Sequence, residues 1–468
     1  MSLLIESQAT PCKADPAIVA QLIECLTNAG YEPLIAKAKQ KFAEVFGVKM
    51  QKAILSEQST EMMFEYAYRR AMTRRYREDS RVPLAGDLFY TSDGKSILYL
   101  ALIAPDSSGI RRRTKGPQIE TQLEIGYIGD EVNRNALAEM AKVVSEYLNT
   151  TSPDAVWSPV QPSCPPFIEL RQSHDNKFIL ASNLTEQELR LAEQLEDLTT
   201  RNLAVVIRRS GGILANDITK KAGTKPEQTQ AAVEQLSASG LLAQEYVVIC
   251  KKTSNQVNRV DSKEKIEKMT ELGILCSCGN PIGQERIEEL VSPTPILQKM
   301  LDQSYWMTAR LVKLLKELNI PDECILLNLQ EGAEEIDAFV DLEGTLLMFE
   351  LKDNEFSMGH AYPFGGRIGL YKPDIAIIVS TKGVAPEVKE YFKRVKPAAE
   401  IVYVGSLNEF DNNLQRVITQ TRSRRAQELI SQFEPMASLD VPVAQMITTK
   451  LGMERVRPRG RTDDEIPF

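Results

Sequence analysis

The run EEIDAFVDLEGTLLMFELK, residues 334–352, limits the fold of this chain more than any other feature. Apolar residues dominate on both sides of Glu343-Gly344, a pattern that predicts two strands joined by a tight turn. Because side chains alternate along a strand, Glu350 and Lys352 lie on the same face of the second strand. Charged groups within so apolar a sheet are costly unless they are partnered, so we expect this face to have a special role.

The length of the turn decides where Asp337 points. If Glu343 and Gly344 are the two loop residues, Asp337 lies opposite Glu350, whereas a loop one residue longer would move it to the other face. Two opposed carboxylates repel each other, but a divalent cation converts them into a ligand set. The pattern predicts a Mg²⁺ or Mn²⁺ site held by Asp337 and Glu350. The alternative is an acidic hairpin with a surface salt bridge from Lys352.

The order Ile336-Asp337, twelve residues, then Glu350-Leu351-Lys352 resembles the PD-(D/E)xK signature of restriction endonucleases and Holliday-junction resolvases. The resemblance covers less than a quarter of the chain, and Ile336 stands where that family has proline. It implies a restriction-endonuclease-like αβββαβ core that hydrolyses phosphodiester bonds with metal, with Asp337, Glu350 and Lys352 as catalytic residues. Lys352 would stabilise charge on the attacked phosphate or position the water.

Three further residues are candidates for accessory roles. Glu335 is a candidate metal ligand beside Asp337. His360 and Arg367 fall where the family that the motif resembles has substrate-contacting residues on its second helix. A lone histidine or arginine there can equally be structural, and both interpretations stay open.

Residues 213–242 predict a helix-turn-helix, with a turn at Ala222-Gly223 and Pro226 at the start of the second helix. The strand EYVVICKK follows, which is typical of a winged helix. Candidate DNA contacts on the second helix are Lys225 for phosphate and Gln228, Thr229 and Gln230 for base edges. The helix is not basic, so a structural or protein-contact module is the alternative.

Cys276-Ser277-Cys278-Gly279 resembles half of a zinc knuckle, and Cys250 ends a strand upstream. Structural zinc sites need four ligands, whereas only these three cysteines are visible and neither histidine is near. We therefore favour buried thiols and do not expect zinc. Seven scattered cysteines and an N-terminus without a signal-peptide pattern predict a reduced, cytoplasmic protein.

Composition narrows the function classes. Hydrophobic residues make up 43% of the chain without a run long enough to cross a bilayer, so no membrane partner is expected. The net charge of -8 argues against a uniformly basic surface, although arginines cluster near residues 69–81, 111–113 and 422–425. DNA is the preferred partner and RNA the alternative, and a homodimer or a defence-system protein partner is a further expectation.

The fold class expected is multidomain α/β and α+β. The domains are an α+β domain of unknown role (1–182), a winged helix-turn-helix (183–262), a linker with Cys-x-Cys (263–300), a PD-(D/E)xK nuclease-like domain (301–410), and a helix with a mobile tail (411–468). The preferred function is a metal-dependent DNA endonuclease, by analogy of architecture in restriction or antiviral (phage) defence. The alternative is a non-catalytic DNA-binding regulator or adaptor with a nuclease-like scaffold.

Overall fold

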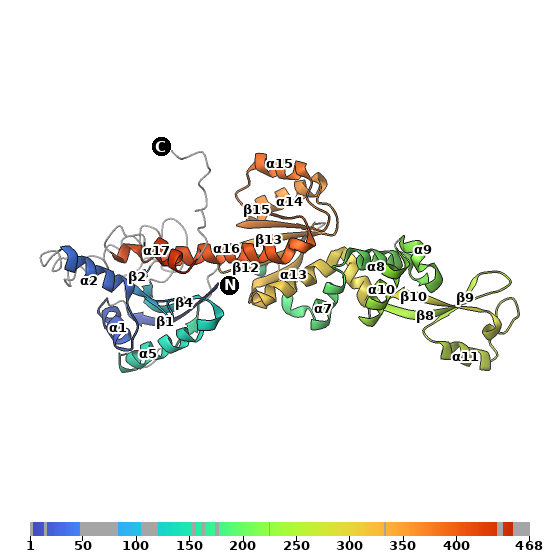
Figure 1. The fold of residues 1–468 in the computed structure, drawn as a ribbon, viewed down its shortest axis with the longest axis horizontal. Coiled ribbons are helices and arrows are strands. Elements are labelled where there is room, and N and C mark those ends of the chain that lie inside the picture. Colours follow the sequence, from blue (N-terminus) through green and yellow to red (C-terminus); the bar gives the residue numbers. More distant parts are fainter. Residues whose placement is uncertain are drawn as a thin grey trace. The chain divides into compact units, whose positions relative to one another are not determined.

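The computed structural model describes residues 3–13, 16–46, 83–103, 120–151, 156–160, 164–173, 177–223, 225–331, 334–437 and 443–452. The chain forms two compact units. One comprises Met1–Cys164, Leu342–Gly344 and Leu414–Phe468, and the other Pro165–Asp341 and Thr345–Asn413. Both units combine helices with β-sheet, so the expected mixed, multidomain α/β and α+β class is confirmed at that level (Figure 1).

The first unit is built on an antiparallel sheet with the strand order β2-β3-β4-β1-β5. Its strands are β1 (Leu4–Lys13), β2 (Pro83–Tyr90), β3 (Ile97–Ile103), β4 (Glu120–Gly129) and β5 (Ser158–Pro159). The sequence pattern did not predict β1, because LIESQATPCK has no continuous apolar run and contains a proline. Ten backbone pairs with β4 nevertheless hold it inside the sheet.

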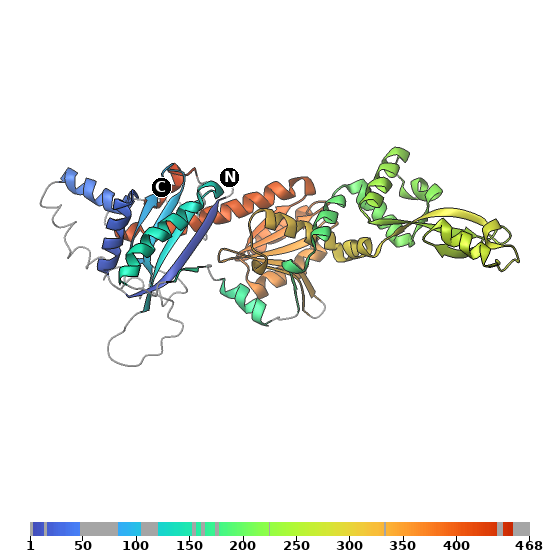
Figure 2. The same ribbon diagram turned by 90° about the horizontal axis from the view of Figure 1, so that it is seen from below.

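Strand β3 shows why this sheet needs helices on both faces. Its sequence ILYLALI is buried at every position, as expected for a strand covered on both sides. Leu98, Leu100 and Leu102 pack in one core with α1 and α5, and Tyr99 and its same-face neighbours pack in another with α2, α16 and α17 (Figures 1 and 2). These helices are α1 (Pro16–Asn28), α2 (Leu34–Phe46), α5 (Asn135–Thr151), α16 (Phe410–Ser431) and α17 (Val443–Lys450).

The C-terminal part of the chain contributes to the N-terminal core. Ala426, Ile430 and Phe433 are buried against the five-stranded sheet, although the sequence predicted only a helix and a mobile tail after residue 411. The expectation of a mobile tail falls partly on residues 453–468, which lie outside the described residues.

A second long-range contact fixes helix α2 to strand β2. The Asp87 carboxylate accepts hydrogen bonds from the backbone N–H groups of Ile35 (2.8 Å), Ala36 (2.9 Å) and Leu88 (2.7 Å). The first two belong to the opening turn of α2, where N–H groups have no partner within the helix. Asp87 therefore caps a helix that lies about fifty residues away in the sequence.

The second unit contains a mixed sheet with the strand order β15-β14-β13-β12-β11-β6, with α13 on one face and α14 and α15 on the other (Figure 1). The elements are β6 (Ile179–Leu180), α13 (Tyr305–Glu317), β11 (Ile325–Glu331), β12 (Glu334–Leu342), β13 (Thr345–Lys352), α14 (Met358–Tyr371), β14 (Ile375–Ser380), α15 (Pro386–Val395) and β15 (Glu400–Val404). Strands β13, β14 and β15 run parallel, and β11 is antiparallel to β12 and β6. The helices and strands from α13 to β14 follow the order expected from the sequence.

Strand β6 shows that the predicted end of the N-terminal domain is wrong. Leu180 pairs with Leu326 of β11, so it belongs to the sheet of the second unit, although the sequence placed residues up to 182 in the N-terminal domain. A two-residue strand that follows a polar segment has no periodicity from which its partner could be predicted.

The middle of the chain forms a separate sheet with the strand order β7-β10-β8-β9. Its elements are α7 (Glu186–Gln194), α8 (Leu198–Ser210), β7 (Ile213–Leu214), α9 (Ile218–Ala222), α10 (Pro226–Ala238), β8 (Leu242–Ile249), β9 (Gln256–Val260), α11 (Lys263–Glu271) and β10 (Arg286–Pro293). The predicted linker 263–300 is therefore wrong in one respect. Its strand β10 pairs with β8 over eight residues and is part of the sheet.

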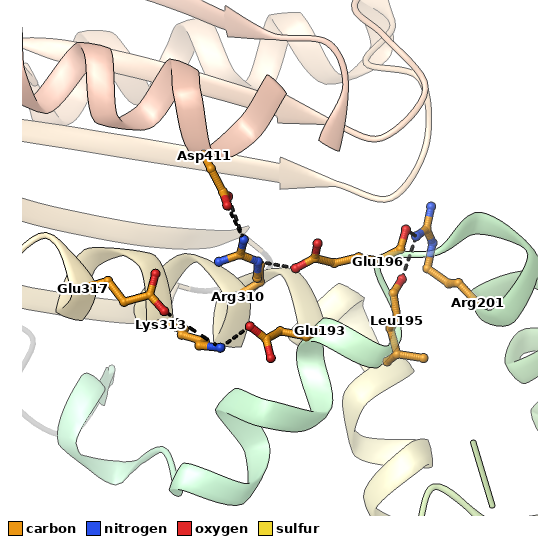
Figure 3. A network of polar contacts seen from close by, with 8 residues as sticks. All are labelled: Glu193, Leu195, Glu196, Arg201, Arg310, Lys313, Glu317 and Asp411. Atoms are coloured by element: carbon orange, nitrogen blue, oxygen red, sulfur yellow. Dashed lines mark hydrogen bonds and ion pairs between the residues drawn. The ribbon is translucent and has the colours of Figure 1, made fainter. Parts of the chain in front are cut away.

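Ion pairs connect helices of the second unit (Figure 3). Arg310 of α13 pairs with Glu196 and, through Nη2, with the Asp411 carboxylate at 2.6 and 2.7 Å. Lys313, one turn later, pairs with Glu193.

Every helix of the described ranges is too short or too polar to cross a lipid bilayer.

Candidate active site on the β12–β13 hairpin

The turn between β12 and β13 has the length on which the predicted register depends. Glu343 and Gly344 are its two residues, and their φ angles are 54° and 88°. Two consecutive positive φ angles define the type I′ turn, which matches the twist of a two-residue hairpin. The predicted loop is confirmed, and with it the placement of Asp337 and Glu350 on the same face of the sheet.

The three residues of the motif converge at one point. Lys352 Nζ lies 2.9 Å from Glu350 Oε1 and 4.0 Å from Asp337 Oδ2. Asp337 Oδ2 also accepts a hydrogen bond of 2.7 Å from the backbone N–H of Leu351. Asp337 is only 6% exposed and Glu350 only 1%. The acidic face predicted from the sequence is thus a buried cluster and not a surface salt bridge.

The charge state of Lys352 follows from its neighbours. Burial lowers its pKa, but the negative charges of Asp337 and Glu350 raise it by more, so that the pKa lies above its ordinary value. Lys352 therefore remains a cation at neutral pH. It can stabilise an anion, but it cannot serve as a general base there.

Arg367 of α14 completes the cluster. Its Nη1 lies 2.9 Å from Glu350 Oε2 and its Nη2 lies 3.5 Å from Oε1, in a buried two-point contact. The sequence left open whether Arg367 contacts substrate or is structural. The contact of Arg367 with the Glu350 carboxylate supports the structural interpretation of Arg367, because a buried carboxylate is stable only when it is paired.

The other two accessory candidates do not join this cluster in the described contacts. The Nδ1 atom of His360 accepts a hydrogen bond of 3.1 Å from the backbone N–H of Ser357, and its ring packs on Phe356. His360 therefore caps the start of α14. The Glu335 backbone pairs with Gln330 of β11, and its side chain lies outside the described residues.

Asp337 and Glu350 form a donor set that fits a divalent cation. Their oxygens lie close enough together that a single ammonium reaches both. Carboxylates from adjacent strands are the ligands that Mg²⁺ and Mn²⁺ prefer, with the remaining positions filled by water or phosphate oxygen. The positive charges of Lys352 and Arg367 already balance the negative charges of Asp337 and Glu350. A divalent cation would therefore bind most favourably together with an anionic group.

A pair that the sequence did not predict lies next to Lys352. Arg201 of α8 is buried, and its Nε lies 3.1 Å from Asp353 Oδ1. Its guanidinium also lies over the ring of Trp306, at 4.8 Å from the centroid. No local pattern indicates this pair, because the two residues are about 150 positions apart.

The predicted DNA-contacting helix is α10, and its exposed side chains are only partly those expected. Lys225, Gln228 and Gln230 are exposed. Thr229 is buried, and its hydroxyl donates a hydrogen bond of 3.1 Å to the carbonyl of Lys225. The prediction of Thr229 as a DNA contact is wrong, because helical spacing places it on the inner face with Ala232 and Leu236.

Of the three arginine clusters, only the one near residue 422 lies within the described residues, and there Arg422 is buried. Arg422 is therefore not available to nucleic acid, whereas Arg424 and Arg425 are partly exposed. The clusters near residues 69–81 and 111–113 lie outside the described residues.

The three cysteines considered as zinc ligands lie together. Glu285 lies beside Cys250, Cys276 and Cys278. One ligand atom from each of these four residues lies within 4.8 Å of the others. Glu285 has no local signal in the sequence, because the usual ligands of structural zinc are cysteine and histidine.

No protein-family model and no curated protein matches this chain. Among solved structures, the crystal structure of protein VC1899 from Vibrio cholerae is similar at 13% sequence identity with a TM-score of 0.29. The match covers 55% of this chain and 57% of that one, little more than half of either. So distant a likeness supports neither a fold assignment nor a function.

Proposed function

We propose that residues 301–410 form a metal-dependent nuclease of the PD-(D/E)xK type, which hydrolyses phosphodiester bonds of DNA. The observation that supports this most is the convergence of Asp337, Glu350 and Lys352 from two adjacent strands at one buried point. Structural salt bridges seldom place two carboxylates side by side in a sheet, because their repulsion is destabilising without a cation. A site that binds metal and phosphate explains that arrangement.

Each residue has a distinct task in this proposal. Asp337 and Glu350 would hold Mg²⁺ or Mn²⁺, which when bound polarises the phosphate and lowers the pKa of a water molecule. Asp337 is oriented for this by the N–H of Leu351, and Glu350 by Arg367. Lys352, a cation at neutral pH, would stabilise the negative charge that develops on the phosphate under attack.

DNA is the proposed substrate because of the element order in the middle of the chain. The order α8-β7-α9-α10-β8 with the returning strand β10 matches the order expected for a winged helix, in which α10 would be the recognition helix. Lys225 at its N-cap and Gln228 and Gln230 on the helix are exposed, and in this proposal they would contact phosphate and base edges. RNA remains the alternative substrate.

One observation favours a second function, a non-catalytic DNA-binding adaptor with a nuclease-like scaffold. Arg367 already neutralises Glu350 in a two-point contact, so the cluster is balanced without metal. In an adaptor these four charges would only stabilise the sheet. The two functions differ in whether the cluster supports turnover.

The deciding experiment compares the purified chain with Lys352→Ala on duplex DNA, single-stranded DNA and RNA, with Mg²⁺, with Mn²⁺ and with chelator. The matched control is Lys393→Ala, which removes an exposed lysine of α15 in the same part of the chain. We expect metal-dependent cleavage of DNA by the wild type and the control, and none by Lys352→Ala. No cleavage by any of the three proteins would leave the adaptor as the better description, and equal cleavage by all three would refute the catalytic role proposed for Lys352.

A further inference from the structure

The strongest unassigned cluster lies at the far end of the β8–β10 sheet. Cys250 follows β8, Cys276 and Cys278 lie in the loop after α11, and Glu285 directly precedes β10. Three segments separated by up to 35 positions thus place three sulfur atoms and one carboxylate oxygen within 4.8 Å of one another. Around a tetrahedral zinc ion with thiolate ligands, neighbouring sulfur atoms lie roughly 3.8 Å apart, so the cluster has the right size.

Hydrogen bonds hold the backbone around these residues in tight turns. The N–H of Thr253 donates to Cys250 Sγ at 3.4 Å. The Cys276 N–H donates to Asn280 O and the Gly279 N–H to Cys276 O, both at 2.8 Å, which folds the Cys-x-Cys segment into a tight turn. Both sulfur atoms of that segment belong to the cluster.

Glu285 supplies the independent reason to expect an ion. It is 4% exposed, and the ion pairs of the described residues include none with Glu285. Its Oε2 accepts a hydrogen bond of 2.6 Å from the N–H of Lys251, while Oε1 accepts one of 3.0 Å from the Cys278 thiol. A buried carboxylate aimed at thiols, without a counter-ion, is the state in which a divalent cation would be most stabilising.

The lobe formed by β8, β9, α11 and the start of β10 is small, so a bound ion would add stability that its core supplies only in part. Its apolar core consists of the buried Val248, Ile266 and Ile282, with four partly buried residues packed against them: Tyr246, Val257, Val260 and Met269. So few residues supply little hydrophobic stabilisation, and small lobes commonly depend on a structural metal. A shared ion would hold the β8–β9 tip, the Cys-x-Cys turn and the start of β10 together.

We propose that Cys250, Cys276, Cys278 and Glu285 bind one structural Zn²⁺ ion. Three thiolates select zinc over magnesium or calcium, and four protein ligands leave no position open for catalysis. The thiols lose their protons to solvent as the ion binds, and no redox change is involved. The sequence did not favour zinc because only three ligands were visible in it, and the structure adds Glu285. This site is independent of the proposed nuclease.

The test measures zinc per chain in the full-length protein purified without chelator. We expect about one equivalent in the wild type and in Cys25→Ser, a control that removes a half-buried cysteine of α1. Cys276→Ser should lose the metal, and Glu285→Gln should weaken zinc affinity about tenfold or more. Full zinc content in Cys276→Ser would overturn the site, and unchanged affinity in Glu285→Gln would overturn the fourth ligand.

A second measurement covers the case in which the cysteine variant fails to fold. The wild-type chain is stripped with chelator and titrated with Co²⁺ alone, which reports its ligands by visible absorption. We expect thiolate-to-cobalt charge-transfer bands and the intense ligand-field bands of a tetrahedral ion, both displaced by one equivalent of Zn²⁺. A spectrum without charge transfer, or a chain that takes up neither metal, would overturn the proposal.

Discussion

Arg367 of α14 contacts both carboxylate oxygens of Glu350 of β13, at 2.9 and 3.5 Å, where the carboxylate has almost no exposure to solvent. Lys352 Nζ contacts one of the same oxygens, Oε1, at 2.9 Å. Glu350 is therefore fixed by two cations. Its orientation depends on a helix that the short sequence motif does not include.

We expect Arg367→Ala to destabilise the protein by about 3 kcal/mol, because removing one partner leaves a buried charge that is only half compensated. The free energy of unfolding in urea measures this. Arg394→Ala, an exposed arginine of α15, is the control and should change stability by less than about 0.5 kcal/mol. Equal effects of the two variants would show that the Glu350 pair is not needed for stability.

Lys352→Ala should separate metal binding from catalysis. The substitution removes a cation that now contacts both proposed metal ligands, so Mn²⁺ affinity should stay the same or rise, while cleavage falls by at least about a hundredfold. Calorimetric titration with Mn²⁺ and a cleavage assay on the same sample report the two effects. Loss of Mn²⁺ binding together with activity would argue against the role given to Lys352.

Asp337→Asn should remove the metal site with little effect on the fold. An asparagine side chain retains one oxygen, so the hydrogen bond from the Leu351 N–H can persist, but the negative charge is lost. A ligand present at a hundred times its Kd stabilises a protein by about 2.7 kcal/mol, so saturating Mn²⁺ should raise the Tm of the wild type and not of Asp337→Asn. The same Mn²⁺-induced shift in both proteins would place the metal elsewhere.

Lys225→Ala should weaken DNA binding without changing sequence preference. If Lys225 contacts one phosphate, its loss should reduce the slope of log K against log salt concentration by about one. The measurement is fluorescence anisotropy at several salt concentrations, with Lys389→Ala on α15 as the control. A slope that does not change would mean that α10 does not face the DNA backbone.

Asp87 should make the first unit less stable as the pH rises from about 4 to about 7. Burial raises its pKa from the ordinary value of 3.8 to about 6, although three backbone N–H groups and Lys39 favour the charged form. Because the folded state holds this proton more tightly than the unfolded state, its contribution is complete below the unfolded pKa and is lost as the pH passes the folded value, by roughly 2 to 3 kcal/mol.

Denaturation of Asp87→Asn at several pH values checks this. The variant lacks the titrating group, so its stability should depend less on pH over this range than that of the wild type. Parallel curves for the two proteins would contradict the raised pKa. The variant should also be less stable at low pH, because an amide has one oxygen with which to cap α2.

The elements of the proposed nuclease core were predictable because their signals are local. Alternation in TLLMFELK and two turn residues fix the hairpin, and their type I′ turn fixes its register. A one-residue change in that loop would have separated Asp337 from Glu350. Those two residues and Lys352 could therefore be placed together from sequence alone.

Tertiary structure decided everything that joins distant segments. Three arrangements depend on contacts between elements, for which the chain has no local period. They are the contact of Arg367 with Glu350, the position of Glu285 beside the three cysteines, and the capping of α2 by Asp87. The burial of Thr229 and the packing of Phe433 on the N-terminal sheet likewise depend on contacts between elements. Sequence periodicity reports which face of an element is apolar, whereas the partner of that face is settled only when the whole core packs.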